Sequence, residues 1–184
     1  LYRDRRDIHH DLNANLYAIV KLPFGFEYQM NFTPRYHWYE YMNHESAEHP
    51  EWAGDGGRSE RKNEKTFNWQ VDNILRWKKE FGEDHRVEAT FLQNAEKGQW
   101  WKTVAQNKLY SPSDILGFHN IGAGTAPSVS SEDTYKTGDA LMGRLFYSFK
   151  DKYMLTASVR RDGYSAFGSM NPHAVFPAVA LGWV

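Results

Sequence analysis

Cysteine is absent from this chain of 184 residues, and that absence removes several classes of protein from consideration. Without thiols there is no disulfide framework, no thiol nucleophile and no thiolate metal site. An excess of one charge is also lacking, because 22 basic residues face 23 acidic ones. Balanced charge indicates neither a nucleic-acid partner nor an anionic membrane surface.

Long hydrophobic runs are missing as well. No stretch approaches the ~20 apolar residues that a membrane-spanning helix needs. Barrel strands are not excluded by this, because they alternate apolar and polar residues in segments of about 10. The chain has no visible signal peptide, begins with Leu1 and ends at Trp183-Val184 inside an expected strand, so we expect a piece of a longer protein.

What the sequence does contain is period-two alternation, the mark of strands with one apolar and one polar face. Strands are expected at 13–22, 26–39, 66–79, 86–105, 138–149, 153–160 and 175–184. One face is expected to carry Trp69, Val71, Leu75, Leu145, Tyr147, Leu155 and Val179, and the other Gln70, Asp72, Arg76, Arg144 and Arg160. Asn73 and Ile74 are the exceptions to this alternation.

The connections between these strands alternate in length. Short turns are expected at 23–25, 81–85 and 151–152, long loops at 41–65 and 106–137, and a medium connection at 163–173. In the second long loop, SPSDILGF predicts one short helix capped by Ser113 or Asp114. Outer-membrane barrels combine short periplasmic turns with longer extracellular loops. The pattern therefore predicts an all-β, antiparallel up-and-down transmembrane barrel, present here as about seven strands.

The last residues also carry a resemblance. RRDGYSAFG, a short loop and FPAVALGW resemble the signature "RxDGSSxFG…FPSVSLGW" of SusC/RagA-type TonB-dependent outer-membrane transporters. The chain departs from that wording at Tyr164-Ser165-Ala166 and at 170–173, which affects loop contacts and leaves the strand parity intact.

This resemblance implies a 22-stranded barrel with an N-terminal plug, in the outer membrane of a Gram-negative, Bacteroidota-type bacterium. Residues 1–184 would be part of the barrel and would include neither plug nor TonB box. The implied activity is TonB-dependent uptake of a bulky nutrient, an oligosaccharide in preference to a peptide. The implied partners are a SusD-like surface lipoprotein that caps the barrel and TonB, which acts through the plug. No enzymatic activity and no cofactor are implied.

Aromatic residues are the candidate ligand contacts, at 16% of the chain. Trp69, Trp77, Tyr147, Tyr153 and Trp183 lie on expected apolar faces, where lipid contact or an interfacial girdle explains them. A second set lies in or beside the expected extracellular loops: Trp38, Tyr39, Tyr41, Trp52, Trp100 and Trp101. These six either stack on sugar rings, contact a lid lipoprotein or pack the loops together.

Metal and catalytic sites find little support. His44 and His49 lie near Glu45, Glu48 and Glu51, but solvation of a polar loop explains this cluster better than any known ligand spacing. No catalytic set of side chains stands out, and no phosphate loop, nucleophile elbow or zinc motif appears. The alternative to a transporter is a secreted β-sandwich carbohydrate-binding module that stacks sugars on Trp52, Trp100 and Trp101.

Overall fold

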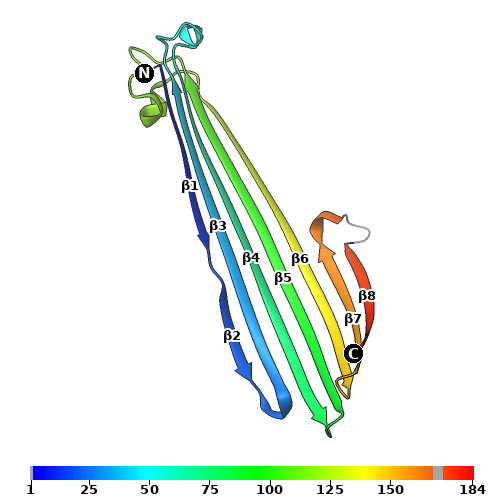
Figure 1. The fold of residues 1–184 in the computed structure, drawn as a ribbon. Coiled ribbons are helices and arrows are strands. Elements are labelled where there is room, and N and C mark those ends of the chain that lie inside the picture. The colour runs from blue at the N-terminus through cyan, green and yellow to red at the C-terminus, as the bar shows by residue number, and fades with distance from the viewer. Residues whose placement is uncertain (1, 168–171) are drawn as a thin grey trace. The chain divides into compact units, whose positions relative to one another are not determined.

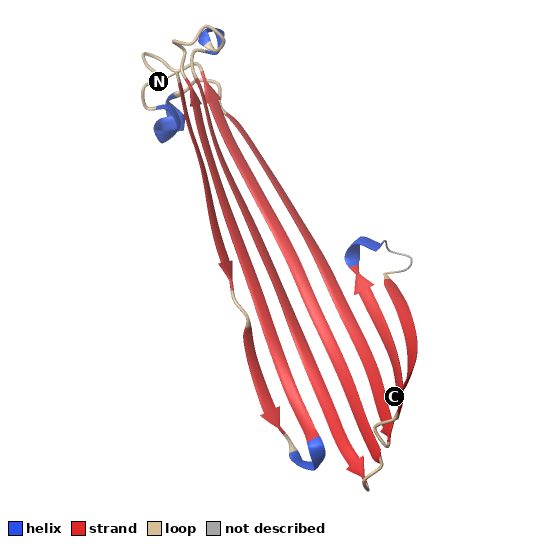
Figure 2. Ribbon diagram, viewed as in Figure 1, coloured by secondary structure: helices blue, strands red, loops and turns tan. Residues whose placement is uncertain are grey.

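The computed structural model describes residues 2–167 and 172–184, and nearly all of its regular structure is β-strand (Figure 2). The described residues form one eight-stranded sheet in the order β1-β3-β4-β5-β6-β7-β8, with β2 also paired to β3 (Figure 1). The strands are β1 (Arg3–Asn13), β2 (Leu16–Lys21), β3 (Phe26–Glu45), β4 (Arg58–Phe81), β5 (His85–Lys108), β6 (Ser128–Phe149), β7 (Tyr153–Tyr164) and β8 (His173–Trp183). The pairs β2–β3, β6–β7 and β7–β8 are antiparallel. The predicted antiparallel, up-and-down partial barrel is confirmed, and the sheet is open between β1 and β8 across the described strands.

Several strands are longer than the sequence predicts. The strands expected at 26–39, 66–79, 86–105 and 138–149 extend to β3, β4, β5 and β6, so the loops expected at 41–65 and 106–137 shrink to 46–57 and 109–127. The added segments are mostly polar, and hydrophobic alternation reports a one-sided apolar environment rather than the strand itself. The strand expected at 13–22 corresponds to β2, and the prediction misses β1, which precedes β2 and is separated from it by residues 14–15.

The connections keep the predicted alternation. The short connections are residues 22–25, which contain the 3-10 helix Pro23–Gly25, residues 82–84 and residues 150–152. In the last of them, Lys150 and Asp151 both have positive φ. The connection 150–152 is one residue longer than the two-residue turn predicted at Asp151-Lys152. The long connections 46–57 and 109–127 contain the 3-10 helices Ala53–Asp55 and Gly117–Ala123. The connection predicted at 163–173 begins with the 3-10 helix Ser165–Phe167, and residues 168–171 lie outside the described part of the chain.

The helix predicted over SPSDILGF is wrong in position. The 3-10 helix starts only at Gly117, and neither Ser113 nor Asp114 caps it. The Ser113 hydroxyl instead accepts the N–H of Ile115 at 3.2 Å, a local turn that competes with helix formation. Among the described residues, no helix combines the length and apolar character that crossing a membrane requires.

The chain forms two compact units. Unit 1 comprises the described residues within Leu1–Leu12, Arg35–Phe67 and Gln99–Tyr135, and unit 2 those within Asn13–Pro34, Asn68–Gly98 and Lys136–Val184. Hydrophobic side chains are almost never buried: among the described residues only Met42, Phe118 and Ala140 are. Polar residues outnumber them in the interior, and these are Asn43, His44, Glu45, Ser46, Ser59, Asn94, Asn107 and Ser148. Neither unit therefore has the apolar core of a water-soluble domain.

Unit 2 carries an apolar face on strands β3 to β8. A groove of about 540 Å³ on this face is lined by residues that include Phe26, Leu75, Trp77, Phe91, Leu145, Val159 and Val179. The rings of Phe26 and Trp77 lie 6.2 Å apart on neighbouring strands. On β8 the side chains remain largely exposed, with Val179 at 72% and Leu181 at 82%. Nothing in the described part of the chain covers this face.

Polar side chains of unit 2 bond to one another across strands. Arg76 of β4 donates to Glu27 at 3.1 Å and to Gln29 at 2.8 Å, both on β3. Asn94 of β5 donates to Asp72 of β4 at 2.7 Å. These residues have the parity opposite to the apolar set of their strands, so unit 2 separates an apolar face from a hydrogen-bonded polar one.

Asn73, the exception noted in the sequence, is accommodated by two partners. The Tyr28 hydroxyl donates to the Asn73 carbonyl oxygen at 2.6 Å, and the Asn73 amide donates to Gln93 at 2.7 Å. This chain crosses β3, β4 and β5. A polar group on an apolar face is costly unless it is hydrogen-bonded, and here all three side chains have a partner.

Candidate functional site

Unit 1 carries a continuous strip of polar and aromatic side chains across four strands. We call it the polar strip, and it consists of Arg3, Arg5, Asp7 and His9 on β1, Tyr39, Tyr41, Asn43 and Glu45 on β3, Arg58, Glu60 and Lys62 on β4, and Gln106 on β5. Within each strand its members are two residues apart or a multiple of two, so a single face presents them.

The ring of Tyr39 contacts a histidine and a cation within the strip. His9 stacks on it at 4.5 Å between ring centres, and the Lys62 ammonium lies 4.9 Å from the ring centre. The Tyr39 hydroxyl donates to Asp7 at 2.8 Å. Burial and this hydrogen bond to a carboxylate raise the pKa of Tyr39 to about 12.

Asp7 is shared between Tyr39 and Arg5. The Arg5 guanidinium donates to Asp7 at 2.8 Å, and the hydrogen bonds from Arg5 and Tyr39 lower the pKa of that carboxyl group. Arg5 also lies 5.2 Å from the ring centre of Tyr41, and Lys62 lies 5.3 Å from it. The ring of Tyr41 therefore contacts two cations, an arrangement favoured by the aromatic quadrupole.

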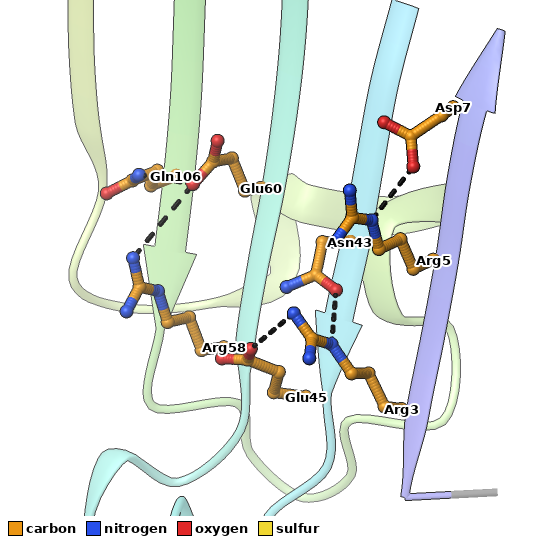
Figure 3. A network of polar contacts seen from close by, with 8 residues as sticks. All are labelled: Arg3, Arg5, Asp7, Asn43, Glu45, Arg58, Glu60 and Gln106. Atoms are coloured by element: carbon orange, nitrogen blue, oxygen red, sulfur yellow. Dashed lines mark hydrogen bonds and ion pairs between the residues drawn. The ribbon is translucent and has the colours of Figure 1, made fainter.

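The outer part of the strip is an array of alternating charges (Figure 3). Arg3 donates to Asn43 at 3.2 Å and pairs with Glu45 at 3.6 Å. On β4, Arg58 lies 3.9 Å from Glu60, which accepts a 2.6 Å hydrogen bond from Gln106 of β5. Chemically, the strip offers donors and acceptors of both signs to a hydrophilic ligand and contains no arrangement for breaking a covalent bond.

Beside the strip, the loop 109–127 is fixed by Asp114. Its carboxylate accepts the Ala47 N–H at 2.8 Å and lies 3.5 Å from His44 Nε2, while His44 Nδ1 is 3.0 Å from the Ser59 hydroxyl. Burial would raise the pKa of Asp114, but the hydrogen bonds from Ala47 and Ser46 outweigh it and lower that pKa. Ser59 is completely buried, at 0% exposure, so the Ser59, His44 and Asp114 set holds the loop and offers no accessible nucleophile.

Two glycines allow this close packing. A Cβ atom on Gly117 would lie 2.6 Å from the His44 ring, and one on Gly57 would lie 2.8 Å from the Asp114 carboxylate. Both glycines also have positive φ, at 48° and 80°. Any larger residue would meet a clash and an unfavourable backbone conformation together.

The six aromatic residues predicted to contact ligand do not form one platform. Trp52 lies in a loop, as expected, with its ring centre 4.4 Å from that of His49. The other five lie in strands, and for Tyr41 this corrects the expected loop 41–65. Tyr39 and Tyr41 belong to the polar strip, with ring faces already contacted by His9, Arg5 and Lys62. Trp38 and Trp101 line a separate groove, and Trp100 has the parity opposite to Trp101 on β5. Any role of these six in ligand binding stays a prediction.

The strip contains residues that sequence reasoning missed. Arg5, Asp7 and Lys62 lie outside the strands that the sequence predicts, so the prediction does not place them on one face. Charges that repeat every second residue, as in Arg3, Arg5 and Asp7, were the available signal. The histidines considered for metal binding serve other contacts, and the described residues contain no group of three or more His, Asp or Glu side chains suited to a metal ion.

Comparisons with known proteins agree with this architecture. No protein-family model matches the chain. It is 29% identical to the TonB-dependent receptor P26 of Formosa agariphila over 135 residues, which are 72% of this chain and 13% of that protein. It is 32% identical to the TonB-dependent receptor SusC of Bacteroides thetaiotaomicron over 91 residues, covering 48% of this chain and 8% of that one.

A solved structure described as the RagAB peptide transporter matches the fold. The superposition has a TM-score of 0.87 and 18% identity, and it covers 97% of this chain and 20% of that one. The chain thus spans only a small part of the length of the relatives it matches. Its single open sheet and these matches support the transporter type expected from the sequence, with this chain as a fragment of the β-barrel of a SusC/RagA-type TonB-dependent transporter.

Proposed function

We propose that the parent transporter takes up a bulky hydrophilic nutrient, an oligosaccharide, across the outer membrane of a Bacteroidota-type bacterium. Uptake draws its energy through TonB, and a SusD-like surface lipoprotein caps the barrel. Residues 1–184 contribute barrel wall, whereas the plug and the TonB box belong to other parts of the parent chain. The names of the relatives support the transport class.

One observation carries this proposal: the apolar face of unit 2 is uncovered, while the polar side chains are hydrogen-bonded to each other. Lipid is the environment in which such an apolar face is favourable, and a closed barrel is the sheet that a bilayer tolerates. The opposite, polar face then borders the water-filled lumen. The sandwich alternative is not supported, because the described strands form one sheet with no second sheet packed on it.

Strand lengths support an assignment of the membrane region. A transmembrane strand needs about 9–11 residues when tilted. β7 and β8 have 12 and 11 residues, whereas β4 and β5 have 24 each. The long strands therefore have enough residues to cross the bilayer and continue beyond it. Because the short turns are periplasmic in such barrels, the continuation carrying the polar strip is extracellular.

The polar strip is the part of this chain that we assign to the nutrient path. By alternation along β3, Tyr39 and Tyr41 share the parity of Glu27 and Gln29, the polar side of that strand. Tyrosine hydroxyl groups, carboxylates and guanidinium groups together offer the hydrogen bonds that sugar hydroxyls require. The mixed charge of the strip also suits peptides, and this second candidate is favoured by the ion pairs Arg3–Glu45 and Arg5–Asp7.

Uptake by the full-length transporter tests the proposal. A strain lacking the parent gene is complemented with wild type, with Tyr41→Ala, or with Lys79→Gln as a control near the short turn at 82–84. Uptake of labelled oligosaccharides and of labelled peptides is then measured in each. Loss of oligosaccharide uptake on deletion, its reduction in Tyr41→Ala and its preservation in Lys79→Gln are expected. Deletion that abolishes peptide uptake and leaves every oligosaccharide unaffected would overturn the choice of substrate.

A further inference from the structure

Unit 1 also has a groove, which lies on the side of its strands away from the polar strip. It has a volume of about 700 Å³ and is lined by residues that include Tyr36, Trp38, Asn63, Lys65, Phe67 and Trp101. This volume falls in the ~300–1,000 Å³ range of small-molecule sites. Tyr36 connects its rings, at 6.4 Å from Trp38 and 6.2 Å from Phe67 between ring centres.

Strand alternation relates this groove to the lipid-facing residues. On β4, Lys65 and Phe67 have the parity of Trp69, Val71, Leu75 and Trp77. The apolar run from Phe67 to Trp77 has the length of one membrane crossing, about 9–11 residues. Lys65 is the next residue of that parity, so it follows the apolar run on the side away from the short turn at 82–84. Aromatic rings followed by a cation are typical of the boundary between hydrocarbon and headgroups.

Lys65 is available to an external anion. Its ammonium lies 5.3 Å from the ring centre of Trp38, and within the described residues no carboxylate lies at ion-pair distance from it. By contrast, Lys62, three residues earlier, pairs with Glu64 at 3.3 Å. An unpaired cation held over an indole ring is a fitting partner for a phosphate group, and the neighbouring aromatic faces suit a sugar ring.

We propose that this groove binds the phosphorylated sugar headgroup of a glycolipid in the outer leaflet, a ligand of the lipid A class. Lys65 contacts the phosphate, Trp38 and Trp101 contact the sugar, and Phe67 contacts the first part of the acyl chains. A nutrient in the lumen does not reach this face, since the groove and the polar strip have opposite parities on β3 and β4. The site therefore anchors the barrel in its membrane and is separate from the nutrient path.

Lipid titration of the purified full-length transporter in detergent, followed by native mass spectrometry, tests this site. The probes are diphosphoryl lipid A, the same lipid without its phosphates, and phosphatidylglycerol, which has a phosphate but no sugar. Wild type is expected to prefer diphosphoryl lipid A to both others. Lys65→Gln should weaken its binding at least about tenfold, the loss expected for one charge-assisted contact.

Two matched variants keep the test decisive. Lys65→Arg retains the cation and should retain binding, and Lys79→Gln removes a cation of the same parity at the other end of β4 and should leave binding unchanged. Equal binding of phosphatidylglycerol would overturn the proposal in favour of unspecific attraction to anionic lipid. Unchanged binding in Lys65→Gln would overturn it too, as would a copurifying protein subunit that shields the groove from all three lipids.

Discussion

Asn73 shows at the residue scale how this chain places a polar group on an apolar face. Its amide group both accepts from Tyr28 and donates to Gln93, so three side chains satisfy one another across three strands. Asn73 is the middle partner, so its removal leaves both Tyr28 and Gln93 without this hydrogen bond, and an unpaired polar group costs more than a hydrogen bond gains.

Asn73→Ala is expected to destabilise the full-length transporter by roughly 1–3 kcal/mol, the cost of unsatisfied polar groups. The free energy of unfolding in detergent is the measurement. Gln70→Ala is the control: Gln70 is exposed and donates to Asp72 on the polar face, so its loss should cost within about 0.5 kcal/mol. Equal losses in the two variants would contradict the role of the Tyr28–Asn73–Gln93 chain.

Neighbouring residues on β4 test the assignment of the two faces. Val71→Arg puts a charge on the face assigned to lipid and should cost about 2–4 kcal/mol if it lies near the bilayer midplane. Gln70→Arg puts the same charge on the polar face and should have a small effect. Unfolding of both variants in lipid vesicles provides the comparison, and a larger loss in Gln70→Arg would reverse the faces.

At the scale of elements, the loop 109–127 depends on a few polar contacts instead of an apolar core. Asp114 accepts the Ala47 N–H and faces His44, so one carboxylate joins this loop to the end of β3. Phe118, at 1% exposure, is the principal hydrophobic side chain that the loop buries. Loss of the carboxylate should therefore release the segment without unfolding the strands.

Asp114→Ala is expected to speed amide hydrogen exchange in residues 46–48 and 109–124, while β4 and β5 keep their protection. Because the pKa of Asp114 is lowered in the folded state, its contribution is present above the ordinary pKa of 3.8 and is lost as pH falls through the lowered value. The protection factors of the wild-type loop, which compare its exchange with that of an unfolded chain at the same pH, should accordingly be unchanged between pH 5 and 8. Faster exchange throughout the sheet would contradict a local role.

The contact between Asp7 of β1 and Tyr39 of β3 predicts that the Tyr39 hydroxyl loses its proton only at unusually high pH. Since the pKa of Tyr39 is raised to about 12, the contact stabilises the fold fully below the ordinary value of 10.0 and loses its effect as pH rises through 12. The tyrosinate absorbance of wild type minus that of Tyr39→Phe should show this late titration. Asp7→Asn should move it to lower pH, because the carboxylate that accepts the phenolic proton is gone. A titration of Tyr39 near pH 10 in wild type would contradict the contact.

At the scale of the whole molecule, the alternation of connection lengths implies a topology. Residues 46–57 and 109–127 are the long connections, and residues 22–25, 82–84 and 150–152 are the short ones. In the proposed barrel, all long connections lie outside the cell and all short ones in the periplasm.

Single cysteines in the otherwise cysteine-free segment test this topology in intact cells expressing the parent transporter. Glu51→Cys should react with a membrane-impermeant thiol reagent, and Asp151→Cys should react only after the outer membrane is permeabilised. Both residues are solvent-exposed and lie in connections outside the strands, so a thiol at either position is accessible to a reagent on its own side of the membrane. Labelling of Asp151→Cys alone in intact cells would invert the model.

Residues 1–184 expressed alone are expected to aggregate or to require detergent. The edges at β1 and β8 and the exposed apolar face of unit 2 are surfaces that promote association. Size-exclusion chromatography with and without detergent provides the measurement. A detergent-free monomer with a cooperative thermal transition would contradict the barrel origin of these strands.

The sequence by itself determined the strand class, the order of short and long connections and the separation of faces at β4, β6, β7 and β8. Alternation such as Trp69, Val71 against Gln70, Asp72 is a local property with a period of two, so it is visible without any tertiary contact. The wording RRDGYSAFG…FPAVALGW supplied the family. Strand ends were poorly predicted, because β3, β4, β5 and β6 continue through segments that are mostly polar, where hydrophobic alternation disappears.

Only the tertiary structure decided which side chains meet. The polar strip joins residues as distant in sequence as Asp7 and Tyr39, or Glu60 and Gln106, through the register of neighbouring strands. Register depends on pairing across the sheet, and a shift by one residue would exchange the two faces. By contrast, the opposite parities of Trp100 and Trp101 on β5 already follow from alternation within the strand expected at 86–105. Sequence gives the alternation within a strand, and pairing between strands gives the site.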